Sequence, residues 1–85
     1  MLNLFILPTC PYCVKVMDYM DEHDIKYEKL NIENPINEET LITLGGKRQV
    51  PFLVDTDNNV ELYESDEIIE YLGPIQQTKS LPIAD

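Results

Sequence analysis

Two cysteines, three positions apart, are the residues of this sequence best suited to covalent chemistry. Cys10 and Cys13 enclose Pro11 and Tyr12, and they are the only cysteines of the chain. An apolar run, residues 2–7, precedes them, and apolar residues at helical spacing follow them. A C-x-x-C pair between a strand and a helix is typical of a dithiol that exchanges disulfides.

The predicted helix start gives the two thiols different roles. Cys10 is the expected N-cap and Pro11 the first helical residue, where the fixed φ of proline suits the helix and its missing N–H goes unused. Unpaired N–H groups and the positive end of the helix dipole then favour a thiolate at Cys10. Cys13 shares an apolar face with Val16 and Met17, so we expect it to be buried. Cys10 is therefore the predicted nucleophile, Cys13 the resolving thiol, and the two the members of a redox-active disulfide.

Three other interpretations of the pair are open. A structural disulfide is one, but a bridge over so short a loop removes little entropy from the unfolded chain. A zinc site is another, but a closed site needs four ligands, and only His23 adds a nitrogen donor. Two inert thiols are the third. Redox chemistry fits the residues best, and no metal is expected.

Length and charge exclude several classes of protein. The chain has 85 residues, enough for one small domain, and 44% of them are hydrophobic, which indicates a folded globule. The net charge of −10 argues against nucleic acid and anionic membranes as partners. We see no signal peptide and no apolar run of about 20 residues, so we expect a cytoplasmic protein. In that compartment thiols stay reduced. We also expect the protein to be a monomer. The acidic surface serves solubility or selects basic partner proteins.

Patterning along the chain predicts seven elements in the order β-α-β-α-β-β-α. Strands are expected at 2–7, 25–32, 52–54 and 60–63. Helices are expected at 11–23, between Asn34-Pro35 and Gly45-Gly46, and at 65–72. The first strand–helix–strand crossover predicts parallel pairing, and the turn residues 56–59 predict an antiparallel hairpin. The expected fold is α/β, with a mixed four-stranded sheet and helices on both faces.

Caps and breakers set the expected ends of the helices. Asn34 or Asn37 is the predicted N-cap of the second helix, and Gly45 is the residue expected to end it in the left-handed region. Ser65 is the predicted N-cap of the third helix, which Gly73-Pro74 should stop. The predicted domain thus covers 1–74, and 75–85 form a loose tail.

Three segments resemble dithiol glutaredoxins. Cys10-Pro11-Tyr12-Cys13 matches their active-site motif, and Val50-Pro51 resembles the cis-proline segment of thioredoxin-fold proteins. Glu64-Ser65-Asp66 resembles the γ-glutamyl-binding turn that glutaredoxins share with glutathione transferase N-terminal domains, and 48–54 is especially similar to the transferases. The resemblance covers residues 1 to about 73 and implies a thioredoxin-like fold.

The resemblance also implies a glutathione site. The cysteinyl part of a bound glutathione would pair with the backbone of Val50, which a cis Pro51 would place, as a short added strand does. Its γ-glutamyl carboxylate would meet Ser65 and the N-terminus of the last helix, and its ammonium would meet Asp66. Tyr12 would wall the groove.

Basic residues complete the implied site. Lys47 or Arg48 would pair with the glycyl carboxylate of glutathione, although both also suit an ordinary surface. Many glutaredoxins carry a lysine shortly before the first cysteine, whereas residues 6–9 here contain none. Lys15 is the cation that could compensate.

The expected activity is that of a glutathione-dependent thiol–disulfide oxidoreductase. Such an enzyme would reduce protein disulfides and glutathione mixed disulfides, with glutathione as reductant and disulfide-containing or glutathionylated proteins as partners. One alternative is a redoxin reduced by a flavin reductase. A second is an iron–sulfur cluster carrier with glutathione as co-ligand, which the rigid Pro11 disfavours. A third is a transferase domain without its helical partner, which the complete cysteine pair disfavours.

Overall fold

The elements follow the predicted β-α-β-α-β-β-α order. The computed structural model describes residues 1–80, with side chains described through residue 73. In that part of the chain the elements are β1 (Leu2–Ile6), α1 (Pro11–Glu22), β2 (Glu28–Asn31), α2 (Pro35–Gly45), β3 (Phe52–Asp55), β4 (Val60–Leu62) and α3 (Ser65–Ser80).

The four strands form one mixed sheet in the order β2-β1-β3-β4. β1 is parallel to β2 and antiparallel to β3, and β3 and β4 form the expected antiparallel hairpin. In the register, Leu4 of β1 lies between Lys29 of β2 and Leu53 of β3. The predicted α/β class, mixed sheet and parallel first crossover are therefore confirmed.

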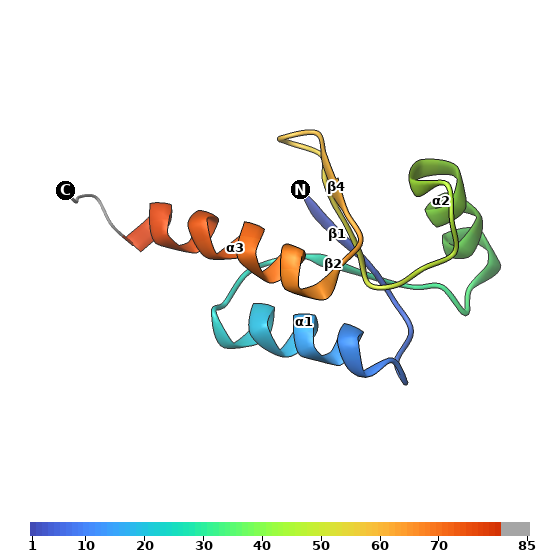
Figure 1. Ribbon diagram of the computed structural model, residues 1–85, viewed down its shortest axis with the longest axis horizontal. Coiled ribbons are helices and arrows are strands. Elements are labelled where there is room, and N and C mark those ends of the chain that lie inside the picture. The colour runs from blue at the N-terminus through green and yellow to red at the C-terminus, as the bar shows by residue number, and fades with distance from the viewer. Residues whose placement is uncertain (81–85) are drawn as a thin grey trace.

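Each face of the sheet has its own core, because successive residues of β1 point to opposite sides. Leu4 and Ile6 pack on the face covered by α1 and α3, and we call this cluster the α1–α3 core; its other buried members are Cys13, Val16, Met20, Leu53, Ile68 and Leu72. Phe5 packs on the face covered by α2; this α2 core also holds Ile32, Leu41, Phe52 and Val54. Figure 1 shows α1 and α3 side by side, with α2 set apart from them.

β2 is shorter than the predicted strand 25–32 because of how α1 ends. Asp24 adopts a left-handed φ of 56°, and the N–H of Ile25 donates to the carbonyl of Met20 across the helix end. The N–H of Asp24 donates to Asp21, which completes a Schellman motif. The chain therefore leaves α1 through Ile25 as an irregular segment, and regular pairing begins at Glu28.

α2 is capped as predicted at its start but not at its end. Asn34 is the N-cap, and its side chain accepts a hydrogen bond from the N–H of Ile36. Gly46, not Gly45, takes the left-handed conformation, with a φ of 88°. Gly45 is the last helical residue, and it lies against the ring of Tyr63, where a Cβ would be 2.0 Å from the tyrosine oxygen.

α3 differs from the prediction at both ends. It begins at Ser65, and the carbonyl of Glu64 accepts the first hydrogen bond, from Ile68, so Ser65 is not the N-cap. It also continues through Gly73-Pro74 to Ser80, across the predicted boundary at 74; the rest of the predicted tail, 81–85, lies outside the described residues. The fixed φ of proline is compatible with a helix, although the residue removes one backbone hydrogen bond and crowds the preceding turn. No helix within residues 1–80 is long and apolar enough to cross a membrane.

Candidate active site

The cysteine pair lies where β1 gives way to α1. Cys10 is the N-cap, with φ −81° and ψ 118°, and Pro11 is the first helical residue, as predicted. The carbonyl of Cys10 accepts the first helical hydrogen bond, from Val14, at 3.0 Å. The side chain of Cys10 makes no capping hydrogen bond, so the sulfur is left to face the positive end of the helix.

The two thiols have different environments. Cys10 is half-buried, whereas Cys13 is 0% exposed and belongs to the α1–α3 core. Burial of the Cys13 thiol raises its pKa to about 12; a hydrogen bond from the Leu7 backbone opposes the rise, and a hydrogen bond and charge interaction with Cys10 add to it. At pH 7 such a thiol is almost entirely protonated. Cys13 is therefore a buried thiol that keeps its proton, and Cys10 is the more accessible of the two sulfurs.

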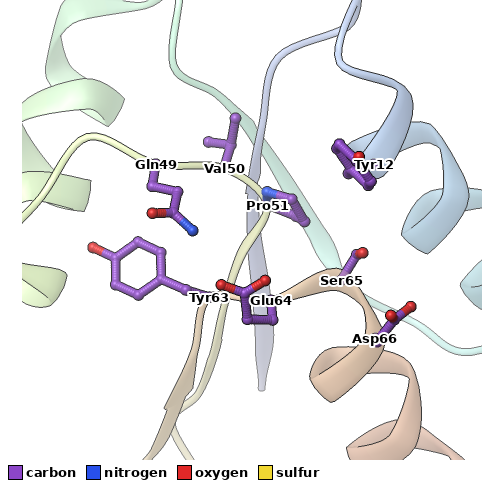
Figure 2. A pocket seen from close by; sticks show the side chains of 8 residues that line it. All are labelled: Tyr12, Gln49, Val50, Pro51, Tyr63, Glu64, Ser65 and Asp66. Carbon is purple, nitrogen blue, oxygen red and sulfur yellow. The ribbon is translucent and has the colours of Figure 1, made fainter.

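A groove of about 350 Å³ lies beside the motif. Five of the predicted ligand residues line it: Tyr12, Val50, Pro51, Ser65 and Asp66. Figure 2 shows Tyr12 and Asp66 on one side and Gln49 and Tyr63 on the other. Cys10 is not among the lining residues, and Tyr12, two positions later, links the motif to the groove.

Segments far apart in the sequence build this groove. Val50 and Pro51 come just before β3, and the peptide bond between them is cis, as the resemblance implies. Val50 forms no backbone hydrogen bond with any residue of 1–80, so its N–H and C=O are free to pair with a ligand. Ser65, only 9% exposed, lies at the N-terminus of α3, where first-turn N–H groups lack helical partners.

The two predicted basic ligand residues lie outside the groove lining. Arg48 pairs through Nε with the carboxylate of Glu38 on α2. Lys47 places Nζ 4.8 Å from the ring centroid of Tyr63, at the edge of the groove. Each cation thus has an intramolecular partner, which sequence reasoning did not supply.

Lys15, the cation expected to compensate near the motif, forms an ion pair that the sequence did not predict. Its Nζ lies 2.7 Å from Oδ1 of Asp66, so α1 and the start of α3 are joined by an ion pair at the mouth of the groove. Both side chains are more than half exposed, and exposed pairs of this kind contribute about 0–1 kcal/mol. The pair matters for ligands more than for stability, because Asp66 is the carboxylate expected to meet an ammonium group.

Three lining residues were not predicted as ligand residues: Gln49, Tyr63 and Glu64, the last of which was named only as part of the turn 64–66. Gln49 and Glu64 adjoin residues that were predicted, so their proximity in the chain was the available signal. Tyr63 directly follows β4, and only its contacts with α2 and the loop after it show that it belongs to this region.

The family is decided by a match that covers most of the chain. Residues 4–80 match the family model described as "Glutathione S-transferase, N-terminal domain". The chain belongs to that family. This placement agrees with the resemblance of residues 48–54 to the transferases and with the turn at 64–66, which the two groups share.

Individual relatives of this glutathione S-transferase N-terminal domain include glutaredoxins. Prostaglandin E synthase 2 of Mus musculus is 36% identical over 73 residues, which are 84% of this chain and 18% of the mouse protein. Glutaredoxin 1 of Rickettsia felis is 35% identical over 51 residues, 56% of this chain and 50% of that protein. The structure of glutaredoxin 2 from Salmonella typhimurium in complex with glutathione superposes with a TM-score of 0.77 at 27% identity, covering 100% of this chain and 37% of that one.

These matches establish the fold and a distant relationship. The domain has the predicted thioredoxin-like fold, and it is a glutaredoxin-like protein with a close cysteine pair. It spans half the length of the Rickettsia glutaredoxin and a smaller part of the other two relatives.

Proposed function

We propose that this domain is a glutathione-dependent thiol–disulfide oxidoreductase of the glutaredoxin type. The observation that carries the proposal is the contrast between the two thiols: Cys10 is half-buried at the start of α1, and Cys13 is buried with a pKa of about 12. Disulfide exchange needs an accessible thiol that attacks the substrate, and a second, protonated thiol beside it does not compete for that attack.

In the first step the Cys10 thiolate attacks the glutathionyl sulfur of a glutathione mixed disulfide. A new Cys10–glutathione disulfide forms, the original S–S bond breaks, and the substrate leaves as a thiolate that takes a proton from water. Two electrons pass to the substrate as the Cys10 sulfur is oxidised. For a protein disulfide the same attack leaves the substrate protein bound to Cys10 until a second thiol releases it.

In the second step a thiol attacks the mixed disulfide on Cys10. Glutathione attacks the glutathionyl sulfur, so oxidised glutathione leaves and the Cys10 thiolate returns. Attack by Cys13 instead would give a Cys10–Cys13 disulfide, which two glutathiones then reduce. Because the attacking group must be a thiolate, the raised pKa of Cys13 favours external glutathione for glutathionylated substrates.

The groove has groups that fit glutathione. The unpaired backbone of Val50 can receive the cysteinyl part of the tripeptide as a short strand. Ser65 and the first N–H groups of α3 can hold the γ-glutamyl carboxylate, and Asp66 can hold its ammonium if Lys15 shares or releases that carboxylate. Lys47, at the groove edge over Tyr63, is better placed than Arg48 to meet the glycyl carboxylate.

Disulfide-containing or glutathionylated proteins are the proposed substrates. A reducing compartment such as the cytoplasm, where the dithiol stays reduced, is the proposed location.

The test is reduction of a glutathione mixed disulfide, coupled to glutathione and its reductase. We expect wild type and Cys13→Ser to be active and Cys10→Ser to be inactive. Loss of activity in Cys13→Ser would instead make the dithiol route obligatory. An inactive wild type that accepts electrons from a flavin reductase would replace this proposal with the glutathione-independent redoxin.

A further inference from the structure

Tyr63 joins three parts of the molecule that meet beside the groove. Its hydroxyl donates a hydrogen bond to the backbone carbonyl of Lys47 at 2.8 Å. The ammonium of the same lysine lies over its ring, 4.8 Å from the centroid and within cation–π range. Its ring centroid is 4.4 Å from that of Phe52, a buried member of the α2 core. One side chain therefore links the core, the loop after α2 and the groove wall.

Gly45 makes room for this arrangement. A Cβ on Gly45 would lie 2.0 Å from the hydroxyl oxygen of Tyr63 and 2.7 Å from its Cζ, both far inside contact distance. The end of the tyrosine ring thus presses directly on the last turn of α2. The next residue, Gly46, turns the chain into the segment 46–50, which we call the groove loop.

Few backbone hydrogen bonds hold the groove loop, although the Arg48–Glu38 ion pair also ties it to α2 and Val50 packs against both cores. Within residues 1–80, the Lys47 carbonyl is the only backbone group of residues 47–50 that forms a hydrogen bond. The loop ends at Val50, whose backbone lines the groove, and Figure 2 shows the Tyr63 ring beside Gln49 of the same loop. A change at Tyr63 can therefore reach the Val50 backbone through three intervening peptide units.

We propose that Tyr63 is a positioning residue that fixes the groove loop and so sets the affinity of the groove for a peptide-like thiol ligand. The ligand class depends on the proposed function, because a tripeptide that pairs with the Val50 backbone needs that backbone held in one place. Tyr63 would act on ligand binding and not on the sulfur chemistry. It lies outside the cysteine motif, and its contacts are with Gly45, Lys47 and Phe52.

The test compares Tyr63→Phe, which loses the hydroxyl but keeps the ring, with Tyr27→Phe as a matched control. The Tyr27 hydroxyl contacts only Asp21, at 3.4 Å and away from the groove, among the described residues. We expect Tyr63→Phe to raise the KM for glutathione and the Kd for S-methylglutathione by about 2- to 10-fold, as loss of one hydrogen bond would, with kcat unchanged. Tyr27→Phe should change neither constant.

A second readout needs no activity. Amide chemical shifts and heteronuclear relaxation of residues 46–50, measured without ligand, should show a displaced and more mobile groove loop in Tyr63→Phe. Gly45→Ala should give the same pattern with the tyrosine intact, because the added methyl must push the ring away. Circular dichroism should show that both variants keep the native fold.

The outcomes separate this inference from the proposed function. If loop signals and ligand affinity are the same in Tyr63→Phe and wild type, the inference is wrong even if the enzyme is active. If wild type neither binds S-methylglutathione nor turns over, the proposed function fails, and an undisturbed loop in the variants would overturn the positioning role as well. A fall in kcat with KM unchanged would also contradict it.

Discussion

Replacing Tyr71 with phenylalanine should destabilise the domain by an amount that depends on pH. The Tyr71 hydroxyl donates a 2.6 Å hydrogen bond to Asp55, a carboxylate that is 3% exposed and also accepts hydrogen bonds from Asn58 and from the Asp57 backbone. A hydrogen bond to a charged group contributes about 1.5–3 kcal/mol. For a domain of this size, that loss lowers Tm by roughly 6–24 °C.

The sign of the pH dependence follows from two pKa shifts. Burial alone would raise the pKa of Asp55, but the hydrogen bonds from Tyr71, Asn58 and Asp57 outweigh it and hold that pKa below its usual value. The carboxylate therefore stabilises the fold above its unfolded pKa of about 3.9, and this contribution is lost as the pH falls through the lower folded pKa. Burial and the bond to Asp55 raise the pKa of Tyr71, so its contribution is present below about pH 10 and is lost as the pH rises through the folded value.

Urea denaturation of wild type and Tyr71→Phe from acid to alkaline pH measures this effect. The difference in unfolding free energy should be flat between about pH 4 and pH 10 and should shrink at both ends. Tyr27→Phe serves as the control, since its 3.4 Å bond to Asp21 is longer and exposed, and it should change stability by less than about 0.5 kcal/mol. A loss in Tyr71→Phe below that size at pH 7, or a loss that does not shrink as Asp55 is protonated, would refute the reasoning.

Three further predictions concern the site and the turn beside it. Lys15→Met should change the free energy of unfolding by no more than about 1 kcal/mol. It should raise the affinity for glutathione at low salt, because Asp66 loses its competing partner. Calorimetry at low and high salt checks this, and an unchanged affinity would contradict it. Iodoacetamide at pH 7 should alkylate Cys10 and spare Cys13, as peptide mass spectrometry would show, and equal labelling of both would be inconsistent with the buried, protonated Cys13. Gly46→Ala should cost about 1–2 kcal/mol in urea denaturation, because φ is 88° there; no loss would mean that the turn can rearrange.

The sequence predicts the fold well because its signals are local and agree with one another. The apolar run before Cys10 and the Pro11 helix start are both read from neighbouring residues, and both are present in the structure. The end of α3 could not be read this way. The fixed φ of proline is compatible with a helix, so whether the helix stops at Pro74 depends on the whole helix and not on the Gly73-Pro74 pair alone.

The groove is less predictable because contacts between distant segments decide it. Val50 and Ser65 could be placed from their motifs, and both line the groove. The pairing of Lys15 with Asp66 joins residues that are 51 positions apart, and nothing in either local sequence indicates it. Tyr63 was missed for the same reason: its role depends on Gly45, which looked like an ordinary helix terminator.

The division of the site between one short segment and several distant ones has a consequence for the unfolded and partly folded chain. Cys10, Pro11 and Cys13 lie within a few residues, so the start of α1 alone brings the two thiols close together. The groove needs Tyr12, Val50 and Ser65 together, and these meet only when the first, middle and last parts of the domain have packed. When the domain loosens, the groove should therefore be lost before the closeness of the two thiols, so a partly folded chain would keep its cysteine pair without a site to bind a ligand beside it.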